Sequence, residues 1–196
     1  MGRAMTKLLS LLAALPLSAC ISFGAEPPPS LLTLDPAATI ATGQTQTGQA
    51  GTITIRVPQT PQELSVERVP VRSTDTSIAY VKDAQWVEPP ARLFARLLGD
   101  TVTARTGRMV LTRRQSNVDP GAELTGELRS FGIDAATSEA VVTYDAAILR
   151  PGATNFEKRR FEARVPVAVV EASAVGVALN QAANQVAGEV ADWVGR

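Results

Sequence analysis

The residue of this chain whose type and position point most directly to chemistry is Cys20. It is the only cysteine among 196 residues, and it follows a short apolar run near the N-terminus. Arg3 and Lys7 lie before or at the start of that run, residues 8–17 form its core, and two small residues at 18–19 separate it from the cysteine. This order of basic, apolar and small zones is typical of a secretory signal peptide. The run is shorter than the roughly 20 apolar residues that a membrane-spanning helix needs.

The sequence Leu17-Ser18-Ala19-Cys20 resembles the bacterial lipobox, in which an aliphatic residue and two small residues precede a cysteine that becomes lipidated. An unpaired cysteine in an exported protein otherwise needs a special explanation. A thioether bond to a diacylglycerol supplies that explanation. We therefore expect cleavage before Cys20 and lipid anchoring through its sulfur. The alternative is an ordinary cleaved signal peptide followed by an unmodified thiol.

Composition narrows the chemistry that the remaining residues can perform. The chain contains no histidine, which removes the commonest general base and the commonest metal ligand. The chain has 19 basic residues (Lys and Arg) and 19 acidic residues (Asp and Glu). This balance of charge argues against a nucleic acid partner. We recognise no phosphate-binding loop, nucleophile elbow or metal-spaced cluster. We therefore expect a binding protein rather than an enzyme, with no catalytic residues, no metal and no cofactor.

The chain divides into three predicted parts. Residues 1–19 form the signal peptide, residues 20–29 form a tether that its prolines keep extended, and residues 30–196 form one domain. The hydrophobic pattern of this domain predicts a mixed α/β fold. We expect strands at 30–36, 52–57, 68–73, 77–83, 108–114, 123–133, 140–149 and 156–165. We expect a short helical piece within 58–67 and a polar loop at 37–51.

Two amphipathic helices should cover the sheet. The first begins at Pro89 and Pro90, closes at Gly107 and carries its apolar residues at spacings of three and four. The second spans 174–194 with Ser173 as its N-cap. Its polar face, which we expect to point away from the core, contains Asn180, Gln181, Asn184, Gln185, Glu189 and Asp192. In strand 140–149 both faces mix polar and apolar residues, so we expect neither to be wholly buried.

Several residues have both a functional and a structural interpretation. Asp75, Asp83 and Glu88 could act as acid and base, but turns and helix capping explain them better. Residues 157–164 could form a basic patch for anionic lipid head groups. Acidic residues alternate with the basic ones there, which favours a solvated strand. The two tryptophans, at 86 and 193, could grip a ligand, but core anchoring is the plainer interpretation.

Residues 69–102 resemble the signature region of the ABC-type transport auxiliary lipoprotein family, the group that includes paraquat-inducible lipoprotein C. The family pattern is a strand ending in an Arg and Ser/Thr turn, a strand with Tyr, and then a Trp-x-Glu-Pro sequence before an amphipathic helix. The matching residues are Arg72, Ser73, Tyr80, Trp86, Glu88, Pro89, Leu93 and Leu97. The lipobox completes the resemblance, which covers nearly all of the chain after Cys20.

The resemblance implies a three-layer domain, a mixed β-sheet with helices packed on it, similar to the N-terminal domain of TolB-type proteins. It also implies a role beside an ABC transporter that moves lipids between the inner and outer membranes. The expected partners are the MCE-domain protein of that transporter, the membrane through lipidated Cys20, and phospholipid as a further ligand. Ile21 stands where an Asp would retain the protein at the inner membrane, which favours the periplasmic face of the outer membrane.

Two other functions remain open at this point. Similar small α/β lipoproteins activate peptidoglycan enzymes, so a regulator of an envelope synthase is one alternative. An envelope hydrolase with a Ser/Lys or Ser/acid arrangement is the other, and the absence of histidine and of a nucleophile motif disfavours it. For a binding protein, we expect the adhesive surface at the exposed edge of strands 123–165 and in the loop at 37–51.

Overall fold

The structure, a computed structural model, describes residues 30–40, 43, 50–117 and 121–196. The predicted signal peptide, Cys20 and most of the 37–51 loop lie outside the described residues. In chain order the elements are β1 (Thr52–Ile55), η2 (Gln62–Leu64), β2 (Arg68–Thr74), β3 (Ser77–Gln85), α2 (Pro90–Thr106), β4 (Met109–Val110), α3 (Arg113–Ser116), β5 (Ala122–Asp134), β6 (Glu139–Leu149), β7 (Glu157–Pro166) and α4 (Ala172–Val194). No helix in this part of the chain has the length and apolarity needed to cross a membrane.

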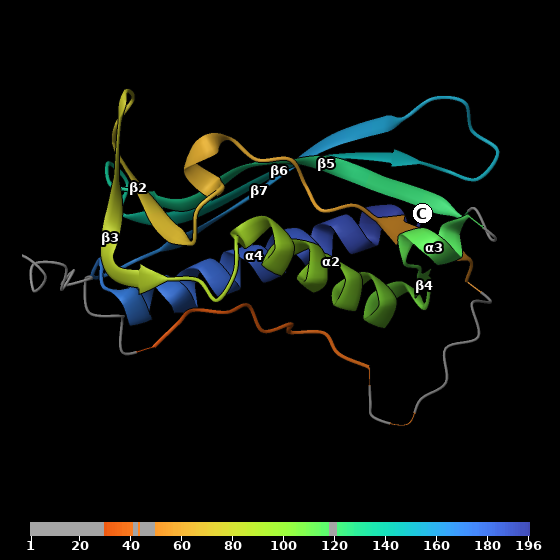
Figure 1. Cartoon of the computed structure of the whole chain (residues 1–196), viewed down its shortest axis with the longest axis horizontal. Coiled ribbons are helices and arrows are strands. Elements are labelled where there is room, and N and C mark those ends of the chain that lie inside the picture. The colour runs from red at the N-terminus through yellow and green to blue at the C-terminus, as the bar shows by residue number, and fades with distance from the viewer. Residues whose placement is uncertain (1–29, 41–42, 44–49, 118–120) are drawn as a thin grey trace, which may run out of the picture.

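The long strand β5 organises a seven-stranded mixed sheet (Figure 1). One edge of β5 pairs antiparallel with β6, and β6 pairs antiparallel with β7, as the predicted meander requires. The other edge pairs parallel with β1 near the beginning of β5 and with β2 near its end. Strand β4 extends the sheet beside β1, and β3 extends it beside β2. β5 therefore carries two short strands in succession along a single edge.

Two glycines in β5 allow its neighbours to approach. A Cβ atom on Gly132 would collide with the backbone of Pro70 in β2. A Cβ atom on Gly126 would collide with the carbonyl of Asp145 and would lie 2.6 Å from the ring of Tyr144. Glycine is the residue that permits such close backbone approach in a strand.

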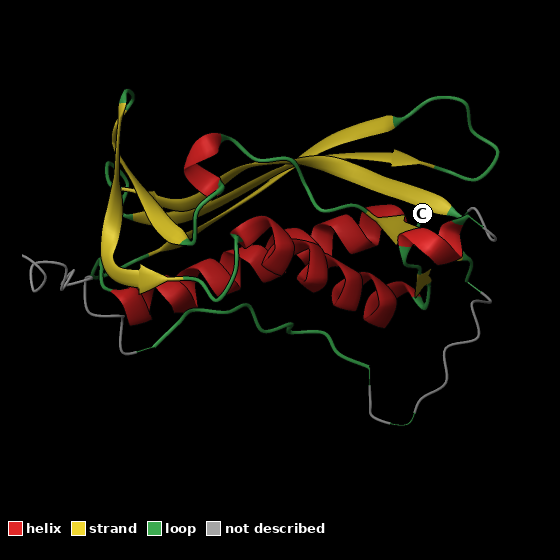
Figure 2. Cartoon of the chain, viewed as in Figure 1, coloured by secondary structure: helices red, strands yellow, loops and turns green. Residues whose placement is uncertain are grey.

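Helices α2 and α4 pack against each other and lie on the same face of the sheet (Figure 2). We call this the inner face. The apolar stripes predicted for both helices are buried there, including Phe94, which is fully buried. The inner face of β6 is also wholly buried, which makes our expectation for that strand wrong. Its inward residues are Val142, Tyr144, Ala146 and Ile148.

Both ends of α2 agree with the sequence signals, whereas the start of α4 does not. Pro90 is the first residue of α2, and Gly107 ends it with a left-handed φ of 70°, as predicted. Helix α4 begins at Ala172, two residues earlier than expected, with Glu171 at the N-cap position and no side-chain cap. The prediction of Ser173 as N-cap is therefore wrong.

Residues 30–40, which we call the N-terminal segment, are extended but do not form the predicted strand. Only Leu32 pairs with the sheet, through a bridge to Trp86. The next residues bind side chains of α4 instead: the N–H of Asp35 donates to Asn180 at 2.9 Å, and that of Ala37 donates to Asn184 at 2.7 Å. These two asparagines therefore hold the segment on the side of the helices that faces away from the sheet. We had expected both side chains to point away from the protein.

The predicted strand at 108–114 is also shorter than expected. Only Met109 and Val110 pair with β1, and the chain then turns into the short helix α3. Thr112 starts this helix with a capping box, in which its N–H donates to the side chain of Gln115 at 2.9 Å. The local capping signal therefore ends the strand.

The predicted fold class is confirmed: the domain is a mixed α/β fold with helices packed on its sheet. The described layers are the sheet, the helix pair and the N-terminal segment, which crosses the outer side of the helices as extended chain (Figure 2). The β2–β3 hairpin and the short helical turn η2 lie where the sequence places them.

Candidate functional site

The residues of the family motif fall into a buried set, a half-buried set and an exposed set. Trp86, Leu93 and Leu97 are at most 2% exposed and belong to the core. The ring of Trp86 meets that of Phe131 edge to face, with centroids 5.4 Å apart. Trp193 is also buried, with its ring 5.6 Å from that of Phe161. The interpretation of both tryptophans as core anchors is confirmed.

The middle of the motif is structural as well. Glu88 pairs with Arg96 of α2, and Pro89 occupies the N-cap position of that helix. The guanidinium of Arg68 lies 4.3 Å from the ring centre of Tyr80, across the β2–β3 hairpin. Asp75 lies in the hairpin turn and Asp83 has a φ of 57° in β3. Asp75, Asp83 and Glu88 thus lie at a turn, an irregular strand position and a helix start, which supports the structural interpretation.

Arg72 and Ser73 form the exposed set, at the end of β2. Arg72 lines a pocket of about 200 Å³ on the sheet face opposite the helices, which we call the outer face. Leu64, Pro70 and Val141 supply apolar walls, and Ile78, 40% exposed, lies on the hairpin beside Arg72. We call this cavity the hairpin pocket.

The rim of the hairpin pocket contains two charged residues that form no ion pair with the described part of the chain. Arg129, Glu162 and Arg164 also line the pocket, and each of them takes part in ion pairs. Neither Arg72 nor Glu63 takes part in an ion pair with any described residue. An apolar pocket with unpaired charges at its rim suits a partner side chain that is apolar and adjoins charged groups.

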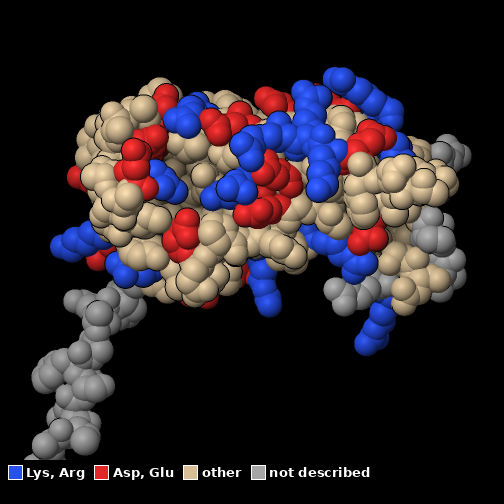
Figure 3. All heavy atoms as spheres, turned by 90° about the horizontal axis from the view of Figure 1, so that it is seen from above, with Lys and Arg blue, Asp and Glu red and all other residues tan. Residues whose placement is uncertain are grey.

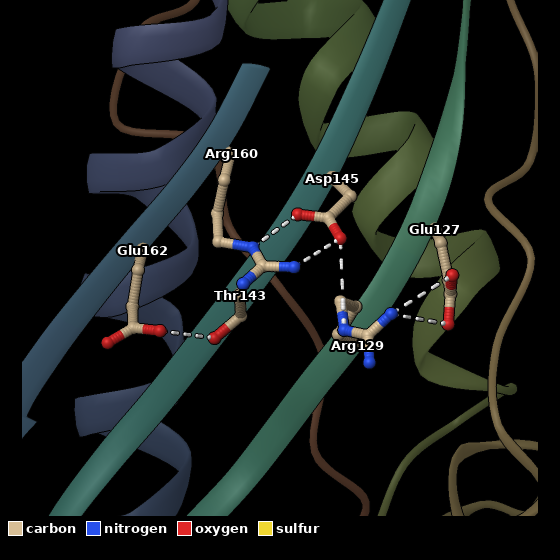
Figure 4. Close-up of polar contacts among 6 residues, drawn as sticks. All are labelled: Glu127, Arg129, Thr143, Asp145, Arg160 and Glu162. Atoms are coloured by element: carbon tan, nitrogen blue, oxygen red, sulfur yellow. Dashed lines mark hydrogen bonds and ion pairs between the residues drawn. The ribbon is translucent and has the colours of Figure 1, made fainter. Parts of the chain in front are cut away.

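The outer face beyond the pocket is covered by alternating charges (Figure 3). A row of ion pairs crosses three strands (Figure 4). Glu127 pairs with Arg129, Arg129 pairs with Asp145, and Asp145 pairs with Arg160. Arg160 reaches Asp145 with two hydrogen bonds, of 2.6 and 2.7 Å. In this ladder, basic and acidic side chains neutralise one another in pairs.

The same contacts set the ionisation of the carboxylates. The hydrogen bond from Arg160 holds the pKa of Asp145 below its usual range, and Arg129 adds to that effect. The pKa of Glu162 is lowered mainly by its hydrogen bond from Arg164, and the hydroxyl of Thr143 also donates to it. Carboxylates with lowered pKa values remain ionised at neutral pH, so they favour ion pairing over proton donation.

These pairs explain residues 157–164, which form most of β7. Residues 157–160, 162 and 164 are exposed, whereas Phe161 and Ala163 are buried beneath the sheet. Arg160 pairs with Asp145 across the strands. The interpretation of this stretch as a solvated strand is confirmed.

Sequence reasoning did not identify the walls of the hairpin pocket. Val141 comes from β6, far from Arg72 in the sequence, and the pairing of β2 with β5 and of β5 with β6 brings the two residues together. Of the residues that line the pocket, only Arg72 was singled out from the sequence, because it belongs to the family motif. Among the described residues, no group of three or more Asp, Glu, Cys or His is placed to hold a metal ion.

Comparison with solved structures supports the fold. The crystal structure of protein XCC0632 from Xanthomonas campestris, assigned to family model DUF330, aligns with a TM-score of 0.69. It shares 19% identity and covers 84% of this chain and 94% of its own. A second crystal structure, of an uncharacterized protein, aligns with a TM-score of 0.65 at 12% identity and covers 84% and 99%.

No curated protein matches the chain in sequence. The model of a protein family does match, over residues 32–191, and its description is ABC-type transport auxiliary lipoprotein component. This match covers the sheet, most of α4 and every exposed motif residue described above. The chain therefore belongs to the ABC-type transport auxiliary lipoprotein family.

Proposed function

We propose that this protein is a periplasmic lipoprotein of the outer membrane that attaches the MCE protein of an ABC transporter to that membrane. In this function it binds and positions other components while lipids pass between the inner and outer membranes. It performs no reaction itself. The observation that carries the proposal is the family match over residues 32–191 in a chain that also has a lipobox at 17–20.

The lipobox supports anchoring through Cys20. Ile21 follows the cysteine where an Asp would retain the protein at the inner membrane, and this supports the outer membrane. Only ten positions separate Cys20 from Ser30, the first described residue. A tether of that length keeps the domain within about 33–36 Å of its lipid, because each extended residue spans at most about 3.3–3.6 Å.

The carboxylates of the outer face support binding rather than turnover. A general acid needs a pKa raised toward neutral pH. The carboxylates of the outer face have the opposite property, because arginines lower the pKa values of Asp145 and Glu162. Their ion pairs leave few charges free to act on a substrate.

The hairpin pocket is the best-equipped surface for the protein partner. It offers a cavity of about 200 Å³ that has apolar walls and a charged rim, and Arg72 and Glu63 at that rim have no ion pair with a described residue. Stable interfaces bury about 800 Å² on each partner and draw most of their binding energy from a few apolar and arginine anchors. We assign the contact with the MCE protein to this pocket and the exposed end of the β2–β3 hairpin.

The test is affinity capture from envelope extract with the mature lipoprotein in detergent. The wild-type protein should recover the MCE protein, and Arg72→Glu should lose it because the charge at the pocket rim is reversed. Lys158→Glu is the matched control, since Lys158 is exposed on the outer face but does not line the pocket. Both variants should keep the melting temperature of the wild type.

The outcomes separate the parts of the proposal. Equal capture by Arg72→Glu and wild type would move the contact away from the pocket. Capture of a peptidoglycan synthase in place of the MCE protein would favour the regulator alternative. Cys20→Ser should abolish incorporation of labelled palmitate, and a wild-type protein without palmitate would contradict the anchor.

A further inference from the structure

One end of the described domain carries five of the nine large exposed apolar side chains that the structure describes. These five residues lie where the N-terminal segment meets the first turns of α4. We call this set the apolar end. It consists of Leu31, Val87, Val169, Val170 and Val177.

Leu32 explains why residues from separate stretches of the sequence meet at this end. Its carbonyl accepts a hydrogen bond of 2.9 Å from the N–H of Val87. Its side chain lies against α4 at Gly176, where an added Cβ would come within 2.8 Å of it. Val177 follows that glycine, and Val169 and Val170 lie just before the helix.

The groove within this set is uncharged, and Glu171, the exposed N-cap residue of α4, is the charged residue that follows Val170. A groove of about 390 Å³ runs between the end of β7 and the start of α4, with Val165, Val167 and Val177 among its lining residues. No charged residue lines this groove, and α4 carries no charge from Ala172 to Gly188. Contiguous exposed apolar surface of this kind marks a contact with a protein or a membrane.

The position of the tether identifies the membrane as the occupant. Ser30 directly precedes Leu31, so the chain that leads to Cys20 leaves the domain at the apolar end. The ten residues of the tether hold the lipidated sulfur within about 33–36 Å of this surface. No other part of the described domain is tied so closely to the bilayer.

We propose that the apolar end rests on the lipid surface, with its valines at the boundary between head groups and acyl chains. This inference depends on the proposed lipid anchor at Cys20. Surface binding of this type increases with the apolar area that enters the interface. The long axis of the domain then points away from the membrane, and the β6–β7 turn and the C-terminus lie at the end farthest from it (Figure 1).

Site-specific fluorescence can measure this orientation. Because lipidation consumes the thiol of Cys20, an introduced cysteine is the only reactive one in the mature protein. Val177→Cys places a polarity-sensitive dye at the apolar end, and Val57→Cys places it elsewhere on a valine of comparable exposure. Each lipidated variant is inserted into phosphatidylethanolamine and phosphatidylglycerol vesicles that contain lipids with a spin label on the acyl chain.

The dye at 177 should shift to the blue and be strongly quenched, whereas the dye at 57 should behave as in water. Adding Val169→Asp and Val170→Asp to the Val177→Cys protein should remove most of the quenching, while the protein still floats with the vesicles. Equal signals from 177 and 57 in a floating protein would overturn the inference and leave the anchor intact. Quenching at 177 only after the MCE protein is added would assign the surface to that partner instead. Failure to float would contradict the anchor itself.

Discussion

The two faces of the sheet are built from alternate residues of the same strands, yet one face is apolar and buried and the other is charged and exposed to water. On the inner face, the rings of Trp86, Phe131, Phe94 and Tyr144 form a chain of edge-to-face contacts with centroids 5.3–6.4 Å apart. On the outer face, the charge ladder crosses the same strands in contact with water. Under the proposed function, in which the hairpin pocket binds the partner, stability and binding belong to opposite faces. Substitutions on the two faces should therefore have separable effects.

The largest expected effect comes from Trp86 on the inner face. Trp86→Ala should lower the free energy of unfolding by about 3–5 kcal/mol, because it leaves a cavity in the core. That loss is a large share of a typical domain stability of about 5–15 kcal/mol. Thermal and denaturant unfolding of the mature protein measures it.

Trp86→Phe is the matched control for this prediction. The indole N–H of Trp86 is buried without a hydrogen-bond acceptor among the described residues, so phenylalanine removes a group that costs stability. We expect Trp86→Phe to destabilise the protein much less than Trp86→Ala. A normal melt for Trp86→Ala, combined with lost capture of the MCE protein, would break the division between the two faces.

An intermediate effect is expected at Tyr144. Its hydroxyl donates a hydrogen bond of 2.9 Å to the carbonyl of Thr125, and burial raises the pKa of Tyr144 above its usual range. Tyr144→Phe should reduce the free energy of unfolding by about 0.5–1.5 kcal/mol. Tyr80→Phe, on a half-buried ring whose hydroxyl has no hydrogen-bond partner among the described residues, should change it less. Equal losses from both variants would show that the hydrogen bond from Tyr144 to Thr125 adds no net stability.

The smallest effect is expected in the charge ladder, as a change in pH dependence. Asp145 has a lower pKa in the folded protein than its ordinary value of 3.8, so the unfolded chain takes up its proton first as the pH falls. The stability that Asp145 contributes is therefore present at neutral pH and is lost as the pH falls below about 4.

Asp145→Asn should flatten the acid side of the stability profile, because it lowers the melting temperature slightly at pH 7 and leaves it unchanged in acid; the loss at pH 7 is small because exposed ion pairs contribute little. Asp75→Asn in the hairpin turn is the control, since Asp75 has no ion pair with a described residue. Thermal melts between pH 3 and pH 7 compare the two variants. A large loss at pH 7 would show that the outer face also stabilises the fold.

The sequence predicted those parts of the fold that depend on local patterns. Pro90 and Gly107 bound α2, the spacing of apolar residues identifies its buried face, and three alternating strands with polar turns predict the meander. Trp86 was recognised as a core anchor because it lies beside a helix start and in line with the apolar stripe.

Features that depend on distant pairing were not predictable in the same way. In β6, Tyr144 is polar by type, and only the structure shows that its hydroxyl is satisfied and its ring buried. Asn180 and Asn184 have ordinary polar side chains, and nothing local shows that they bind the backbone of residues 35–37. The hairpin pocket was missed for the same reason, since β2 meets the end of β5 only through parallel pairing.

The contacts between the N-terminal segment and α4 have a mechanical consequence. The segment runs along the outer side of the helices, and its tethered end lies at the start of α4 (Figure 1). A force applied through the tether along the helix axis therefore loads the Leu32 bridge and both asparagine contacts in shear. Bonds loaded in shear share the force and fail together, whereas bonds that are peeled fail in turn. In the proposed function, this geometry lets the domain carry tension between its lipid anchor and a bound complex without fraying from its first described residues.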